Sequence, residues 1–129
     1  MAMSTAYELY RSGSALLEQG DHHAATLPLT RARDLEPGSG MVREALGRAL
    51  FGARRFREAA GEFAAVVDRE PTNDYAHFCL GRALQLQGRH AEARPPLTMA
   101  ALLQPQRSDY RVYRDRTIAA LERDDSAAA

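Results

Sequence analysis

A recurrence every 34 residues constrains this chain more than any other feature of its sequence. Five columns of residues return three times each at this spacing. The columns are Pro37, Pro71 and Pro105; Gly13, Gly47 and Gly81; Ala25, Ala59 and Ala93; Leu16, Leu50 and Leu84; and Leu29, Phe63 and Leu97. A fixed period of this length indicates similar units that cannot bury their apolar faces alone and therefore stack on one another.

Each column has a physical reason in a pair of antiparallel helices. The glycines of the first helix and the alanines of the second are small where the two helices must approach closely. The large apolar residues fill the space between the helices. Each proline ends a second helix, because the residue before proline resists the helical conformation.

The order of these columns resembles the signature of the tetratricopeptide repeat. The second unit shows the match with Leu46-Gly47, Leu50, Ala59, Phe63 and Pro71. The resemblance implies an all-α, right-handed α-solenoid of three helix-turn-helix units and a capping helix, seven helices in all. The units span about residues 6–39, 40–73 and 74–107. The sequence departs from the family at three positions where Trp is frequent: Leu9, Arg43 and His77.

Helix starts agree with this register. Thr5 and Glu8 have the spacing of a capping box for the first helix. Ser39, Asn73 and Ser108 follow the three prolines and are expected to cap the next helices.

The turns and the remaining prolines are less regular. Gly20 and Gly88 suit tight turns inside units one and three, whereas Arg54 takes that place in unit two and must turn without glycine. Pro28 and the pair Pro95-Pro96 fall inside second helices, where we expect a bent or shortened helix on the outer face.

The last segment, residues 109–123, is predicted to be the capping helix. Asp115 stands where a fourth unit would need glycine, so no further helix can pack tightly there. We therefore expect a single domain over residues 1–123 and a flexible tail over 124–129.

Composition limits the function classes. The 17 basic and 17 acidic residues cancel, so no overall field favours nucleic acid or an anionic membrane. All the basic residues are Arg, which suggests a GC-rich bacterial source. The single Cys79 excludes an internal disulfide, and no secretory signal or membrane span is recognisable. These features predict a cytoplasmic protein.

By analogy with the family, the first helices line a concave groove that binds a segment of another protein. The groove-facing residues are Tyr7, Tyr10, Ser14, Met41, Glu44, Arg48, Phe51, Tyr75, Phe78, Arg82 and Gln85, with Arg11, Leu17, Ala45 and Cys79 beside them. Tyr and Arg commonly anchor interfaces. Arg48 and Arg82 are expected side by side, open to an acidic group of an acidic and hydrophobic segment. The alternative is that Glu44 or Glu18 already pairs with them.

One subgroup of the family binds chaperone C-termini through a carboxylate clamp of Lys, Asn and Arg. The clamp positions here carry Tyr10, Ser14, Ala45, Tyr75 and Cys79, so we expect no binding of that kind.

Catalytic and metal sites find little support. Asp21, His22 and His23 are adjacent and cannot all face one metal ion, and Cys79 is read as a small filler. No phosphate-binding loop or nucleophile elbow is present. We expect no cofactor, no metal and no enzymatic activity.

The sequence therefore predicts a protein–protein interaction module, acting as an adaptor or a chaperone-like factor. One alternative is a scaffold that assembles into homo-oligomers through its tyrosines. A second alternative is a client chaperone like the small three-repeat chaperones of bacterial secretion systems.

Overall fold

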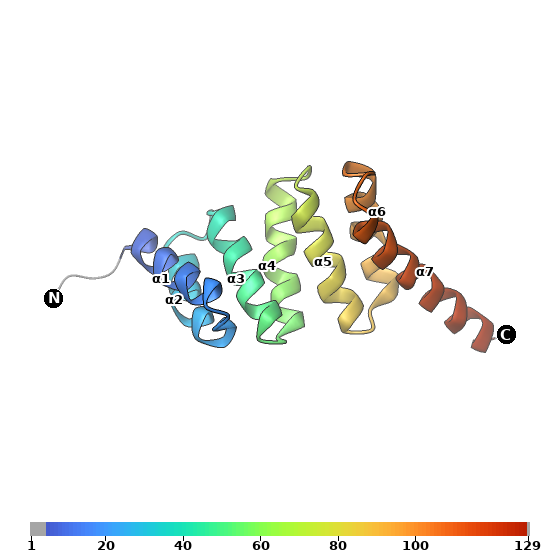
Figure 1. Ribbon diagram of the computed structural model, residues 1–129, viewed down its shortest axis with the longest axis horizontal. Helices are drawn as coiled ribbons and strands as arrows, with labels where there is room; N and C mark the ends of the chain where they lie inside the picture. The colour runs from blue at the N-terminus through green and yellow to red at the C-terminus, as the bar shows by residue number, and fades with distance from the viewer. Residues whose placement is uncertain (1–4, 129) are drawn as a thin grey trace.

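The computed structural model describes residues 5–128, which form seven α-helices and no strand. The helices are α1 (Ala6–Glu18), α2 (His22–Leu35), α3 (Gly40–Gly52), α4 (Phe56–Arg69), α5 (Asp74–Leu86), α6 (His90–Leu103) and α7 (Ser108–Ala128). They stand in a row, with α1 and α7 at opposite ends of an elongated molecule (Figure 1). The expected all-α solenoid is confirmed.

The helices form two layers, because each packs against the next in sequence. Among the first helices of the units, α1 contacts α3, and α5 contacts the terminal helix α7. By contrast, α3 and α5 hardly approach each other. The inner layer is therefore widest between α3 and α5.

The three glycines of the repeat column lie at matching helix crossings. Each faces a fully buried residue of the Leu29, Phe63 and Leu97 column. A Cβ atom added to the glycine would lie 2.4 Å from Leu29 Cγ at Gly13, 2.8 Å from Phe63 Cζ at Gly47 and 2.4 Å from Leu97 Cγ at Gly81. A side chain at any of these crossings would push the two helices of its unit apart.

Two kinds of cap begin the first helices. Thr5 Oγ1 accepts from the Glu8 backbone amide at 3.1 Å, and Glu8 Oε2 accepts from the Thr5 amide at 3.3 Å, so the capping box is confirmed. Ser39 caps α3 and Asn73 caps α5, each by accepting from the amide three residues on.

The expected cap at Ser108 is wrong by one residue. The helix α7 begins at Ser108 itself. The repeat spacing that relates Ser39 to Asn73 places Arg107 at the next cap position. Arg107 instead pairs with Asp109 in the first turn of α7, at 2.7 Å.

The turn inside each unit uses the same left-handed backbone. Gly20 has φ of 80° and Gly88 has φ of 74°. Arg54 adopts the conformation with φ of 63°, as the repeat register requires, although a side chain is disfavoured there. The Arg54 guanidinium lies 5.3 Å from the centre of the Phe56 ring, which partly offsets that cost.

The polar residues that replace Trp bind the ends of the second helices. Each donates a side-chain hydrogen bond to the carbonyl of a repeat proline. The pairs are Arg43 Nε with Pro37 at 2.8 Å, His77 Nε2 with Pro71 at 2.8 Å, and Arg111 Nη1 with Pro105. This column therefore fastens each first helix to the loop that precedes it.

Prolines inside helices neither shorten them nor lie only on the outside. The helices α2 and α6 have 14 residues each, as does α4, which contains no proline. Pro96 is buried rather than on the outer face. Its ring fills space in the packed interior, so the expected shortened helix is not found.

The terminal helix covers the last core edge. Tyr110 and Thr117 of α7 are fully buried, with Tyr110 packed against Ala100 and Ala101 of α6. The helix runs past Arg123, where we expected it to end, as far as Ala128. Figure 1 shows this last part of α7 projecting beyond the other helices.

Candidate functional site

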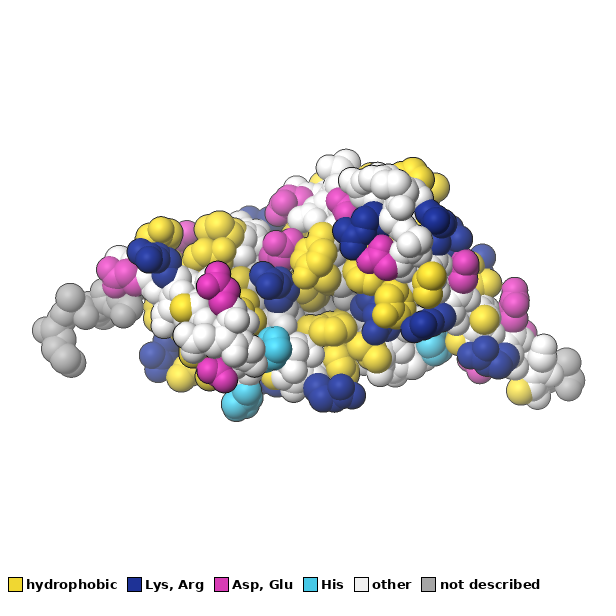
Figure 2. All heavy atoms as spheres, in the orientation of Figure 1, with side chains coloured by type: hydrophobic (Ala, Val, Ile, Leu, Met, Phe, Trp, Pro, Cys, Tyr) yellow, Lys and Arg dark blue, Asp and Glu magenta, His cyan; other side chains and the backbone are white. Residues whose placement is uncertain are grey.

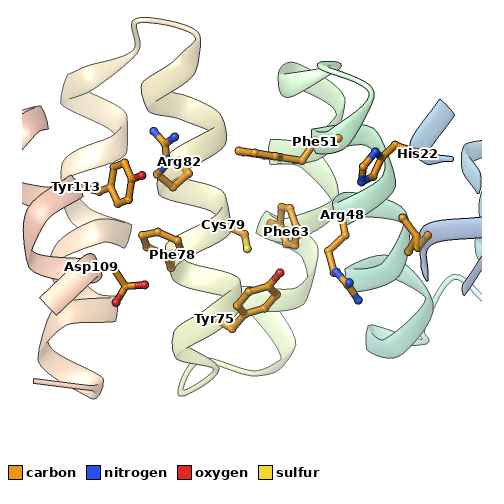
Figure 3. Close-up of a pocket in the computed structure, with 12 residues that line it drawn as sticks. His22, Arg48, Phe51, Phe63, Tyr75, Phe78, Cys79, Arg82, Asp109 and Tyr113 are labelled. Carbon is orange, nitrogen blue, oxygen red and sulfur yellow. The ribbon is translucent and has the colours of Figure 1, made fainter. Parts of the chain in front are cut away.

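A hollow of about 500 Å³ lies where the inner layer is widest, between α3 and α5. Twelve residues line it, drawn as sticks in Figure 3: Leu17, His22, Arg48, Phe51, Gly52, Phe63, Tyr75, Phe78, Cys79, Arg82, Asp109 and Tyr113. Figure 2, in the view of Figure 1, shows apolar and basic side chains together in the middle of this face. The hollow is thus mainly aromatic and carries more positive than negative charge.

Helical spacing brings the lining of α5 onto one stripe. Tyr75, Phe78, Cys79 and Arg82 are separated by three or four residues, so they share one face of the helix. The buried residues of α5, such as Ala76 and Leu84, lie on other faces and hold the helix in the core. The stripe is therefore left to face the hollow.

The terminal helix supplies one wall. Phe78 stacks on Tyr110 with ring centres 4.6 Å apart and meets Tyr113 at 5.6 Å. The Tyr110 hydroxyl donates to Asp74 at 2.7 Å. The Gln85 amide donates to the Tyr113 carbonyl at 2.9 Å and to Thr117 Oγ1 at 2.7 Å. These contacts fix α7 against α5 and set the position of Tyr113.

The two predicted arginines occupy the hollow differently. The Arg82 guanidinium lies 4.0 Å from the centre of the Tyr113 ring and donates to Gln85 at 2.6 Å. Burial, together with the neighbouring Arg116, lowers the pKa of Arg82. Arg48 is exposed and points to the other end of the hollow in Figure 3. The prediction that they stand side by side is wrong, because Tyr113 draws Arg82 towards α7.

No carboxylate pairs with either arginine in the described part of the chain. None of the ion pairs within residues 5–128 includes Arg48 or Arg82, so the alternative with Glu44 or Glu18 is not found. Glu44 instead accepts a long hydrogen bond from Asn73, at 3.5 Å. Both guanidinium groups remain available to an acidic ligand.

Two ionisable groups in the hollow are held neutral. Burial raises the pKa of the Cys79 thiol to about 12. Burial also raises the pKa of the neighbouring Tyr75 hydroxyl to about 12. At neutral pH both groups are therefore uncharged, and the charge of the hollow comes mainly from its arginines and Asp109.

The predicted groove residues divide into three groups. Arg48, Phe51, Tyr75, Phe78 and Arg82 line the hollow. Gln85 supports its wall, and Tyr10 packs against the core. The remaining residues lie outside the lining: the largely exposed Tyr7 and Met41, and the half-buried Ser14 and Glu44.

Sequence reasoning missed three lining residues. Tyr113 and Asp109 come from α7, which was expected only to close the core, and His22 was read as part of a turn. The repeat spacing contained the signal for α7, since Tyr113 follows Cys79 by 34 residues and Asp109 follows Tyr75 by the same distance.

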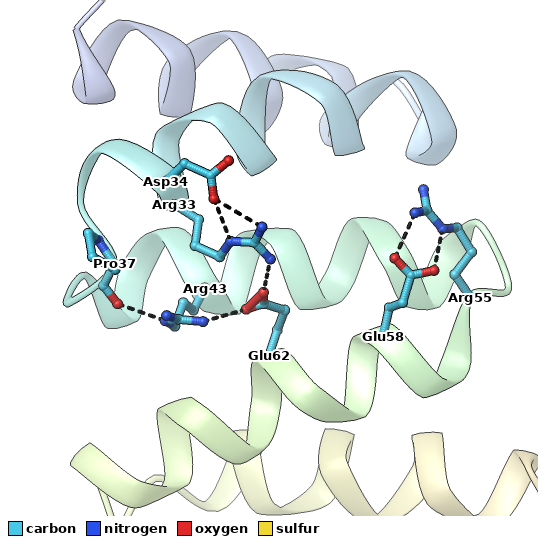
Figure 4. Close-up of polar contacts among 7 residues, drawn as sticks. All are labelled: Arg33, Asp34, Pro37, Arg43, Arg55, Glu58 and Glu62. Atoms are coloured by element: carbon cyan, nitrogen blue, oxygen red, sulfur yellow. Dashed lines mark hydrogen bonds and ion pairs between the residues drawn. The ribbon is translucent and has the colours of Figure 1, made fainter.

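A second polar cluster lies where α2, α3 and α4 meet (Figure 4). The buried Glu62 carboxylate accepts from Arg33 at 2.5 Å and from Arg43 at 2.9 Å. Arg33 also binds Asp34. Because its polar atoms already bind one another, this cluster holds helices together and offers no open ligand position.

Metal-binding and membrane-spanning features were also examined over residues 5–128. Within them, no group of three His, Cys, Asp or Glu side chains is arranged to hold a metal ion. None of the helices in this range has both the length and the apolar character that crossing a bilayer requires.

The comparisons with known proteins agree with the repeat architecture. The family model described as tetratricopeptide repeat matches residues 44–110. A search of curated protein sequences gives no match.

Several solved structures have a similar fold. MamA residues 41 to the end, from Desulfovibrio magneticus RS-1, superposes with a TM-score of 0.86 at 23% identity, covering 95% of this chain and 70% of that one. The first repeat domain of Spaghetti (RPAP3), bound to the HSP90 peptide SRMEEVD, gives 0.83 at 19%, covering 92% and 94%. YrrB, described as having an unusual peptide-binding site, gives 0.81 at 23%, covering 88% and 59%. At these identities the similarity shows the fold alone.

Proposed function

The chain belongs to the tetratricopeptide-repeat family, and from this premise we propose that it is an adaptor or chaperone-like module whose hollow holds a segment of a partner protein. Two of the similar structures are described as peptide-binding, which supports this class of function. Fold similarity does not identify the ligand, so the proposal depends on the hollow itself.

The observation that carries the proposal is an open, aromatic hollow with arginines that have no acidic partner. Its volume of about 500 Å³ accommodates a few side chains of an extended or helical segment. Phe51, Tyr75 and Phe78 offer apolar area, while Arg48 and Arg82 offer charged hydrogen-bond donors. This combination is typical of interface anchors.

The proposal contains no catalytic step. Cys79 is the only thiol of the chain, and its raised pKa keeps the nucleophilic thiolate scarce at neutral pH. A bacterial source and a cytoplasmic location remain predictions from the sequence.

Site-specific photocrosslinking in the native host tests the proposal. A benzoylphenylalanine placed at Tyr75, inside the hollow, is expected to crosslink to a partner protein. The matched control places it at Leu102, which is 69% exposed on α6 and does not line the hollow. Crosslinks from Leu102 with none from Tyr75 would contradict the proposal.

The partner is not expected to be a chaperone tail of the kind bound by the carboxylate clamp. The clamp positions carry Tyr10, Ser14, Ala45, Tyr75 and Cys79, none of which matches the Lys, Asn and Arg of that subgroup. Titration with the peptide SRMEEVD, the ligand in the RPAP3 structure, should therefore give no saturable binding.

Self-assembly into homo-oligomers is a second candidate, favoured by one observation. Tyr7 is 63% exposed on α1, the helix at the open end of the solenoid. A copy of the chain packed there would cover it. Light scattering across a range of concentrations distinguishes the two, because a strict monomer rules out self-assembly. The client chaperone of a secretion system is a narrower form of the first proposal and predicts crosslinks to an exported protein.

A further inference from the structure

Arginines form a row along the inner layer at the repeat spacing. Arg48 of α3, Arg82 of α5 and Arg116 of α7 are separated by 34 residues each, and the equivalent position in α1 is Ser14. We call these three residues the arginine row. The row therefore begins in the second unit and continues into the terminal helix.

The row is held together around one aromatic ring. The Cζ atoms of Arg82 and Arg116 lie 4.0 Å and 4.8 Å from the centre of the Tyr113 ring. Gln85 fixes both sides of this arrangement, since it accepts from Arg82 and donates to the Tyr113 carbonyl. Two positive groups are thus placed close together by contacts that leave donor groups free.

A second hollow continues from the first on the other side of Arg82. Its volume is about 330 Å³, and Arg82, Arg116, Arg123 and His90 all line it. Arg116 and Arg123 lie on one face of α7, and the small Ala119 and Ala120 leave the space between them open. No acidic residue lines this second hollow.

Local charge is unbalanced here although the chain as a whole is neutral. The ion pairs found within residues 5–128 all lie elsewhere and include no member of the row. Burial and Arg116 both lower the pKa of Arg82, so the cation is held there at a cost. A bound carboxylate would offset that cost through charge-assisted hydrogen bonds.

We propose that the partner segment is acidic and aromatic, with one carboxylate bound between Arg82 and Arg116 in the second hollow and another bound by Arg48. Between the carboxylates, an apolar side chain packs on Phe51, Tyr75 and Phe78 in the first hollow. This inference rests on the proposed function and identifies the chemistry of its ligand. It also makes α7 a part of the binding site rather than only a cap.

Selection from a displayed library of random dodecapeptides tests the ligand chemistry. Wild-type protein is expected to enrich peptides that carry two or more Asp or Glu residues flanking an aromatic or aliphatic one. Binders without acidic enrichment would overturn this inference and leave the proposed function standing. A selection that yields no binder at all would count against both.

Variants then locate the acidic contacts. Arg82→Gln should weaken the best acidic peptide about tenfold, and Arg116→Gln about threefold, because charge-assisted hydrogen bonds are lost. The matched control is Arg94→Gln, an exposed arginine of α6 that lines neither hollow. Because Arg82 also contacts Tyr113, thermal unfolding of Arg82→Gln is measured alongside. The exposed Arg116→Gln is the variant whose affinity decides the outcome.

Two results would overturn the inference at this stage. One is equal affinity of Arg116→Gln and Arg94→Gln for the acidic peptide. The other is binding of oligothymidine as tightly as the peptide with loss in the same variants, which would make the row a nucleic-acid site. Rising salt should weaken the acidic peptide in wild type more than in Arg116→Gln.

Discussion

Two joints of the solenoid occupy equivalent places and are built from opposite chemistry. In the first joint, where α2, α3 and α4 meet, Arg33 and Arg43 bind the buried Glu62. The repeat spacing places Val67, His77 and Pro96 at the equivalent positions of the second joint, where α4, α5 and α6 meet. The first joint is ionic, and the second is mainly apolar.

The backbone is nearly the same at both. The residue that ends the second helix has φ and ψ of −134° and 74° at Glu36, and −127° and 73° at Glu70. Arg43 and His77 both donate to the carbonyl of their repeat proline at 2.8 Å. The comparison shows that the small-residue crossings and the helix ends set the stacking geometry, and that either chemistry fits within it.

Removing the central carboxylate should break the ionic joint. Glu62→Ala leaves two partly buried guanidinium groups without their partner, and we expect a loss of about 3 kcal/mol of unfolding free energy. Urea unfolding measures it. The control is Glu58→Ala, on the same helix, where the pair with Arg55 is largely exposed and should contribute about 0.5 kcal/mol or less. Equal losses would mean that the ionic joint contributes no more than a surface pair.

Filling the crossings tests the claim that both joints depend on small residues. Gly81→Ala should cost about 2 kcal/mol, because the new methyl meets the branched Cγ of Leu97 and lies 3.2 Å from its backbone nitrogen. Gly47→Ala should cost about 1 kcal/mol, because it meets only the far end of the Phe63 ring and alanine favours the helix. Thermal unfolding gives both values, and the reverse order would contradict this view of the crossings.

Converting the ionic joint into an apolar one sharpens the comparison. The triple variant Arg33→Val, Arg43→His and Glu62→Leu carries two residues of the second joint and avoids an added proline. Its unfolding free energy should lie within about 1 kcal/mol of wild type, because well-packed apolar residues commonly replace a buried ionic cluster without loss. Circular dichroism in urea measures it beside Glu62→Ala. A triple variant as unstable as the single one would show that the ion pairs themselves are required.

The turns extend the comparison with the smallest effects. Arg54→Gly should stabilise the chain by about 0.5 kcal/mol, because it relieves a left-handed residue but adds flexibility to the unfolded chain. Gly88→Ala, at the equivalent turn of the next unit, should destabilise it by about 1 kcal/mol. Differential scanning calorimetry distinguishes these opposite signs. Two changes of the same sign would mean that the turns are not equivalent.

Most of the fold was predictable because its determinants repeat. The columns headed by Gly13 and Leu29 each recur three times, and their register also required the left-handed turn at Arg54. The ionic joint was not predictable, because Arg33 and Glu62 lie 29 residues apart and occur only once. Taken singly, they look like ordinary surface charges.

The candidate site was predictable only in part. Helical spacing indicated the lining of α5, including Tyr75 and Arg82. It could not indicate that Tyr113 would draw the Arg82 side chain away from Arg48, because that depends on how α7 packs. Treating α7 only as a cap hid its share of the site.

The central claim is that the hollow between α3 and α5, walled by α7, binds the partner. Chemical-shift mapping of the ¹⁵N-labelled chain with its tightest selected peptide tests this most directly. The account predicts the largest changes at Arg48, Cys79, Arg82 and Tyr113, with little change on the exposed faces of α2, α4 and α6. Saturable binding whose changes centre on those outer faces would contradict it.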